Sequence, residues 1–109
     1  MEFDKKTLTV KAGSKVKLIL TNTASAAVMR HNWVLTKPGK DQEIGLKGTT
    51  KGEASGFIEP SPDILAFTAV SKPGNSVEVV FDAPPVGKYP YICSVSGHYM
   101  MMKGNLIVE

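Results

Sequence analysis

The sequence has little of several features that mark common classes of protein. It holds a single cysteine, Cys93, among 109 residues, so no internal disulfide can form. No apolar run approaches the roughly 20 residues of a membrane-spanning helix. The first residues show no signal-peptide pattern. Basic residues form no block and do not interleave with aromatics, which argues against nucleic-acid binding. These absences favour a small folded domain without covalent cross-links.

The size and composition fit one domain spanning residues 1–109. A chain of this length supports one hydrophobic core, and a hydrophobic fraction of 42% is ordinary for a folded protein. The formal net charge is +3. We interpret this mild excess as solvated surface, with steering of an acidic partner as the alternative.

Short alternating runs separated by Gly, Pro, Asn and Ser predict β-strands. Strand-forming residues at this spacing are typical of an all-β sandwich. The runs cover residues 8–10, 16–20, 31–35, 77–81, 89–93 and 106–108. Residues 37–63 lack this periodicity, and we expect an irregular flap there with at most a helical turn at 49–55.

Four side chains with metal-binding chemistry occupy two segments of the chain. Cys93, His98 and Met102 lie within ten positions, and Gly97 permits a tight turn that brings the imidazole back toward the thiolate. His31 begins a distant predicted strand. Two imidazoles, one thiolate and a weak thioether form the donor set of a blue-copper site.

A blue-copper site combines nitrogen and sulfur donors for a physical reason. Cu(I) prefers soft sulfur, whereas Cu(II) prefers nitrogen, so an intermediate site changes little when one electron is transferred. Asn32, next to His31, is placed to hydrogen-bond the Cys93 loop and to tune the thiolate. This chemistry predicts electron transfer rather than catalysis.

Each residue also has an ordinary structural interpretation. His31 can be a core histidine, His98 an exposed loop residue, and the three consecutive methionines can fill a gap under a loop. All of these interpretations would have to be correct at the same time to exclude a metal site. The chain has only two histidines, and both lie where copper requires them. Among the methionines, Met102 is favoured as ligand because Met100 follows His98 too closely and Met101 faces the opposite side.

Other functions use the same residues. Cys93 and a histidine can form a nucleophile–base pair, but no oxyanion hole or substrate pocket is evident. Copper oxidases and nitrite reductases need further histidines, and a binuclear copper centre needs a second cysteine. A copper carrier or storage protein needs the same donors as an electron carrier. Zinc accepts the same His and Cys donors.

The two ligand segments resemble those of azurin-type cupredoxins. The resemblance rests on His-Asn-Trp-Val-Leu from His31 and on Cys93-x4-His98-x3-Met102-Lys-Gly, and extends over residues 7–109. It implies a cupredoxin-type Greek-key β-sandwich with one copper ion at one end, and a protein that is not an enzyme. Arg30 stands where azurins carry glycine, and the azurin disulfide is absent.

Within this family, the short chain with one cysteine resembles the auracyanins. These are membrane-associated blue-copper proteins of photosynthetic green filamentous bacteria. The resemblance implies a place outside the cytoplasmic membrane, on its periplasmic side, with a tether that this sequence does not include. It implies a monomer whose redox partners are a cytochrome or a membrane oxidoreductase in a photosynthetic or respiratory chain.

His98 is expected to expose one ring edge and to act as the port for electrons. Tyr99, Met100 and Val95 are the expected apolar rim around it. The alternative is that the flap at 37–63 covers these residues.

Overall fold

The computed structural model of the chain describes residues 2–24, 26 and 29–109. Strands make up most of its regular structure, with one α-helix and two short 3-10 helices among the described residues. The elements in chain order are β1 (Thr7–Val10), β2 (Lys15–Thr21), β3 (Val34–Thr36), α1 (Asp41–Lys51), η1 (Glu53–Ser55), β4 (Ile64–Phe67), β5 (Ser76–Asp82), β6 (Gly87–Ile92), η2 (Val95–Met100) and β7 (Lys103–Val108).

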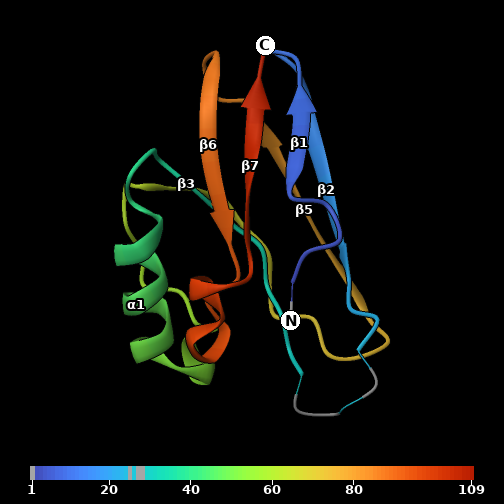
Figure 1. Cartoon of the computed structure of the whole chain (residues 1–109), viewed down its shortest axis with the longest axis vertical. Coiled ribbons are helices and arrows are strands. Elements are labelled where there is room, and N and C mark those ends of the chain that lie inside the picture. The colour runs from blue at the N-terminus through green and yellow to red at the C-terminus, as the bar shows by residue number, and fades with distance from the viewer. Residues whose placement is uncertain (1, 25, 27–28) are drawn as a thin grey trace.

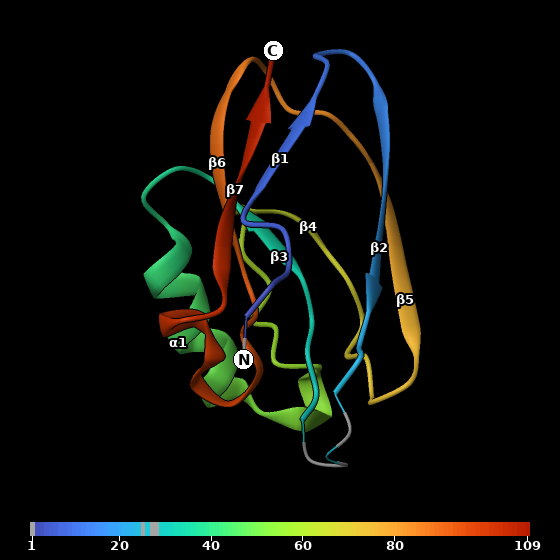
Figure 2. The same cartoon turned by 45° about the vertical axis from the view of Figure 1, so that its right-hand side comes forward.

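The strands form two sheets. One has the order β1-β7-β6-β3-β4, with β1 parallel to β7 and the other neighbours antiparallel. The second is the antiparallel pair β2–β5. Figures 1 and 2 show the five-stranded sheet between this pair and α1, which covers its outer face. The predicted all-β sandwich is therefore confirmed.

The five-stranded sheet is buried on both faces in its middle strands. Trp33 and Leu35 join the core between the two sheets, whereas Val34 packs with Ile44 and Ile92 under α1. Alternate residues of an extended chain point to opposite faces. Residues 31–36 are all buried for this reason, and two separate apolar clusters fix the segment that follows His31.

The prediction for the flap was wrong in its extent. Instead of a loop with a turn at 49–55, an 11-residue helix begins at Asp41 and η1 follows it. Gly45 and Gly48 lower the intrinsic helix propensity, which hides the helix from sequence patterns. Both glycines lie where the helix packs most closely: a Cβ at Gly45 would meet Tyr99 at 2.3 Å, and one at Gly48 would meet the Phe57 carbonyl oxygen at 2.3 Å. Tertiary packing overrides local preference here.

Two strand predictions need correction. The predicted strand at 31–35 is displaced to Val34–Thr36, and His31 forms an isolated antiparallel bridge with Ser71 instead. β4 (Ile64–Phe67) was not predicted at all. It is an edge strand with only one buried residue, so its sequence lacks a clear alternation.

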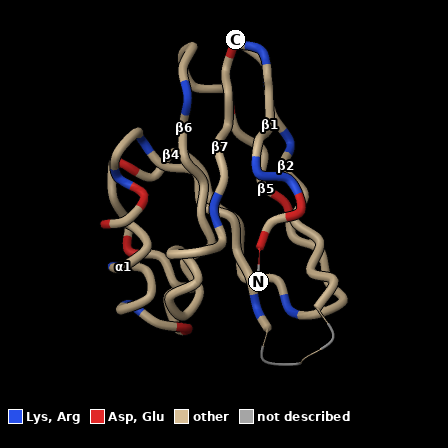
Figure 3. Tube along the Cα trace, viewed as in Figure 1, with Lys and Arg blue, Asp and Glu red and all other residues tan. Residues whose placement is uncertain are grey.

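The loop between β6 and β7 lies at one end of the sandwich. β7 leaves this loop and runs to the opposite end, where the C-terminus lies (Figure 1). Charges of both signs mingle on the strands and α1 (Figure 3), but residues 89–102 carry none. Among the described residues, no helix has the length and apolar character needed to cross a bilayer.

Candidate metal centre

His31 is held at the sandwich end by its own backbone. Its N–H donates to the Ser71 carbonyl across 3.1 Å, and the Ser71 N–H donates back across 2.6 Å. Its side chain is 9% exposed. The bridge fixes the main chain of the histidine, and the two apolar clusters after it fix the direction in which the chain continues. Sequence reasoning missed Ser71, which lies 40 positions away and has no motif to mark it.

Cys93 directly follows β6 and is completely buried. Its N–H donates to the Met102 carbonyl across 3.0 Å, and the Met102 N–H donates to the His98 carbonyl across 2.7 Å. These two bonds close the loop from β6 to β7. The backbone therefore holds three of the four predicted ligands in one small unit.

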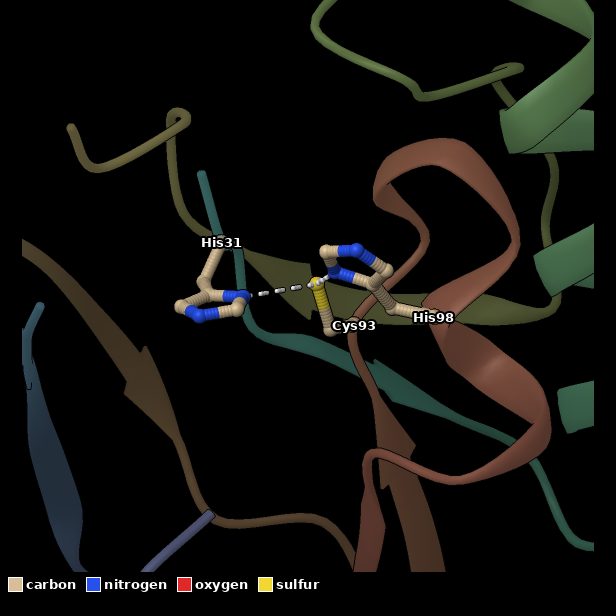
Figure 4. Close-up of side chains that lie close together, drawn as sticks. All are labelled: His31, Cys93 and His98. Carbon is tan, nitrogen blue, oxygen red and sulfur yellow. Dashed lines mark hydrogen bonds between the residues drawn. The ribbon is translucent and has the colours of Figure 1, made fainter. Parts of the chain in front are cut away.

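The side chains of His31, Cys93 and His98 converge (Figure 4). The Nδ1 atoms of His31 and His98 lie 3.9 and 3.6 Å from Cys93 Sγ, and each residue offers a ligand atom within 4.8 Å of the others. Nitrogen and thiolate donors bind metal ions such as zinc at about 2.0–2.3 Å. Atoms spaced in this way can share one ion, so the residues present fit a copper ion.

The surroundings favour neutral imidazoles. Burial lowers the pKa of both histidines, and the proximity of His98 lowers the pKa of His31 further. A neutral imidazole has a free lone pair for a metal, whereas the charged form has none. Both rings are therefore ready to act as ligands at neutral pH.

The thiol of Cys93 is unsuited to nucleophilic catalysis. Burial raises its pKa to about 11, although N–H groups of Asn32 and Val95 favour the thiolate and oppose this effect. A buried thiol that stays protonated at neutral pH is a poor nucleophile. A bound metal ion, in contrast, removes the proton outright. The site thus favours metal binding over the Cys–His enzyme that the sequence left open.

Asn32 ties the two ligand segments together, as predicted. Its backbone N–H donates to Cys93 Sγ across 3.4 Å. Its side chain accepts from the Ser94 N–H across 2.8 Å and donates to Ser94 Oγ across 3.0 Å. Ser94 Oγ donates onward to the Phe57 carbonyl across 2.6 Å. Ser94 is a further residue that the sequence analysis missed, and its position next to Cys93 was the available signal.

The three consecutive methionines have different environments. Met102 is 2% exposed and lines the same cavity as His31, whereas Met100 and Met101 are 65% and 74% exposed. The backbone bonds of Met102 to Cys93 and His98 keep it at the site. This burial supports Met102 as the thioether donor among the three.

The predicted apolar rim around His98 is only partly correct. Val95 is 4% exposed and belongs to the core. Tyr99 is half-buried and packs on the cluster under α1. Only Met100 of the three is exposed. For Tyr99 the stated alternative is correct, because α1, which lies within the 37–63 segment, covers it.

Arg30 occupies the position before His31. Its guanidinium pairs with Glu53 of η1. The pair joins the loop that carries His31 to the segment that follows α1.

Comparison with known proteins identifies the family. The sequence profile described as "Copper binding proteins, plastocyanin/azurin family" matches residues 1–109. The chain belongs to the plastocyanin/azurin family. Proteins of this family bind copper and, as auracyanins and azurins do, carry electrons rather than catalyse a reaction.

Individual relatives agree with this membership. Auracyanin-A of Chloroflexus aurantiacus is 39% identical over 112 residues, which cover all of this chain and 68% of the relative. Auracyanin-B of the same organism is 36% identical, and this chain spans about half (47%) of its length. Azurin of Achromobacter denitrificans is 34% identical, with 97% of this chain and 76% of the relative covered.

The fold agrees as well. The solved structure of auracyanin A superposes with a TM-score of 0.90 at 39% identity, covering 99% of this chain and 89% of that chain. The predicted resemblance to azurin-type cupredoxins and to auracyanins is therefore confirmed, as is the cupredoxin-type Greek-key β-sandwich. Copper is the metal that this plastocyanin/azurin family member binds.

Proposed function

We propose that this cupredoxin is a one-electron carrier on the periplasmic side of the cytoplasmic membrane, in a photosynthetic or respiratory chain. The proposed ligands are His31, Cys93, His98 and Met102. The solved relative described as a "blue" copper protein from a green thermophilic photosynthetic bacterium supports this setting.

The observation that carries the proposal is the convergence of the donor side chains at one end of the sandwich. Cys93 Sγ lies 3.6 and 3.9 Å from the two imidazole nitrogens, and hydrogen bonds hold the main chain at every ligand. Donors fixed in this way need little rearrangement when the charge at the site changes. When bound, copper supplies the Cu(II)/Cu(I) couple.

The residues divide the remaining work. Cys93 supplies the thiolate, and the Asn32 N–H stabilises its charge. His31 is the deeper imidazole. His98 is half-buried on the loop and is the proposed port for electrons. It lies in a segment without charges, residues 89–102, and the exposed Met100 and Met101 follow it. Such a surface suits a weak contact that dissociates quickly.

The test is spectroscopic and kinetic. The copper-loaded protein is expected to show an intense visible thiolate-to-Cu(II) band and to exchange electrons with a cytochrome in stopped-flow mixing. A blue protein that releases copper readily and exchanges electrons slowly would be a copper carrier instead. A colourless protein that holds zinc in preference to copper would contradict the proposed role as a copper electron carrier.

The proposed location and partners are tested in cells of the organism that makes this protein. Antibodies against this chain are expected to detect it in membranes, accessible from the periplasmic side, and to co-precipitate a cytochrome or an oxidoreductase. Detection in the cytosolic fraction would contradict the proposal. Sedimentation is expected to show a monomer, since a carrier must present its copper end to more than one partner.

A further inference from the structure

One hydroxyl of α1 holds the turn that carries His98. Thr49 Oγ1 donates to the Ser94 carbonyl across 2.8 Å and accepts from the Gly97 N–H across 2.9 Å. It therefore spans the turn from the residue after Cys93 to the residue before His98. No sequence motif marks Thr49, which lies 44 positions before Cys93.

The turn itself needs support. Ser96 and Gly97 both have left-handed backbone conformations, with φ of 43° and 83°. A left-handed conformation is unfavourable for a residue with a Cβ, and Ser96 is one of two such residues with positive φ among the described part of the chain. A strained turn persists when its surroundings over-determine it. The Thr49 hydroxyl satisfies polar groups on both sides of Ser96.

The face of α1 that carries Thr49 is built for close approach. Gly45, Gly48 and Thr49 stand at positions i, i+3 and i+4, which share one side of a helix. A Cβ at Gly48 would lie 3.0 Å from the Ser94 Cβ, and one at Gly45 would meet the Tyr99 side chain. The two glycines bring the backbone of α1 against the loop that joins β6 to β7. The short Thr49 side chain can therefore reach both ends of the turn.

We propose that Thr49 is a positioning residue for His98. By fixing the Gly97 N–H it fixes the main chain that enters His98, and so holds the imidazole nitrogen near Cys93 Sγ. Thr49 contacts no metal in this role. It acts through the turn and sets how rigidly the exposed ligand is held. The proposal rests on the proposed role of His98 as a ligand.

The experiment compares two threonines of the same helix. Thr49→Val removes the hydroxyl at nearly constant shape and helix propensity. Thr50→Val is the matched control, because Thr50 is exposed and, within the described residues, its hydroxyl bonds only to the Leu46 carbonyl of its own helix. Thr49→Ser keeps the hydroxyl and should restore the wild-type behaviour. Thr49→Ala against Thr49→Ser repeats the comparison in case the valine variant does not fold.

The first measurement uses the metal-free protein. Hydrogen exchange of the Gly97 amide should quicken about tenfold or more in Thr49→Val, as expected for a lost hydrogen bond, and remain unchanged in Thr50→Val and Thr49→Ser. Equal exchange in all variants would overturn the proposal. This readout does not depend on copper, so it separates a failure of this inference from a failure of the ligand assignment.

The second measurement uses the copper-loaded protein. The energy of the visible band and the copper hyperfine splitting in the EPR spectrum should shift in Thr49→Val and Thr49→Ala, but not in Thr49→Ser or Thr50→Val. A purely structural role would lower the melting temperature without moving the spectra. Spectra that shift equally in Thr49→Ser and Thr49→Val would also overturn the proposal, because packing and not the hydroxyl would then be responsible.

Discussion

The N–H of Cys93 donates to the carbonyl of Met102 across 3.0 Å. This bond joins the residue that follows β6 to the residue that precedes β7, so the thiol and the thioether side chains share one base. The His98 carbonyl accepts from Met102 within the same loop.

Replacing Cys93 with serine should abolish the blue colour. The band arises from charge transfer between a thiolate and Cu(II), and a hydroxyl group has no sulfur to supply it. Absorbance of the copper-loaded Cys93→Ser protein checks this. A persisting intense visible band would show that another residue is the principal donor.

The two histidines should differ in chemical rescue. His98 is half-buried, whereas His31 is 9% exposed and its backbone is paired with Ser71. His98→Gly should therefore leave an opening that added imidazole fills, with recovery of the original spectrum. His31→Gly should recover poorly under the same titration. Equal recovery of both variants would mean that the exposed and buried ligands are wrongly assigned.

The methionine that acts as ligand should be identifiable from the reduction potential of its variants. Met102→Gln should lower it, because an amide oxygen favours Cu(II), and Met102→Leu should raise it by removing the donor. We expect each shift to exceed about 59 mV, a tenfold change in the one-electron equilibrium. The same changes at Met100 and Met101, which are exposed, should have a much smaller effect. Voltammetry of all six variants decides, and large opposite shifts at Met100 or Met101 would reassign the ligand.

Alkaline pH should destabilise the metal-free protein through Cys93. Burial raises the pKa of this thiol from its ordinary value of 9.0 to about 11, so the folded state keeps a proton that the unfolded chain loses. Between pH 9 and 11 the unfolded state binds fewer protons, and the free energy of unfolding should fall by about 2–3 kcal/mol. Denaturant titrations across this range measure it.

Cys93→Ala is the control for this pH effect. The variant should lose less stability over the same interval, because the titrating group is gone. Burial also raises the pKa of Tyr91, to about 12, but that contribution is present in both proteins. Identical slopes in the two proteins would contradict the assignment.

A methyl group at Gly48 should disturb the contact between α1 and the loop that joins β6 to β7. The added Cβ meets the Phe57 carbonyl oxygen at 2.3 Å, so the backbone must shift. We expect Gly48→Ala to lower the free energy of unfolding by about 1–3 kcal/mol, despite the better helix propensity of alanine. Lys47→Ala, at the neighbouring exposed position, should be nearly neutral. Thermal unfolding of both variants tests the difference.

The convergence of His31, Cys93 and His98 could be predicted from the sequence because these residues combine local spacing with rarity. Cys93, His98 and Met102 lie close together, and His31 is the remaining histidine of the chain. The buried environment of Met102 agrees with the choice made from its position. Asn32 was also predictable, since it adjoins a ligand.

The supporting residues were harder to predict because they act at long range. Thr49 and Ser71 contact the site only through the tertiary fold, and no motif near them in the sequence indicates that they support the ligand residues. The helix that carries Thr49 contains Gly45 and Gly48, which weaken its sequence pattern and at the same time allow its packing. Local patterns miss features whose stability comes from distant contacts.

The course of β7 has a practical consequence. The strand starts at the loop that joins β6 to β7 and runs to the opposite end of the sandwich, where the C-terminus lies (Figure 1). A thiol linker or affinity handle added at that end would anchor the molecule to a gold electrode with His98 facing the solution. Such a film would present every molecule in the same orientation, ready to meet a dissolved donor or acceptor.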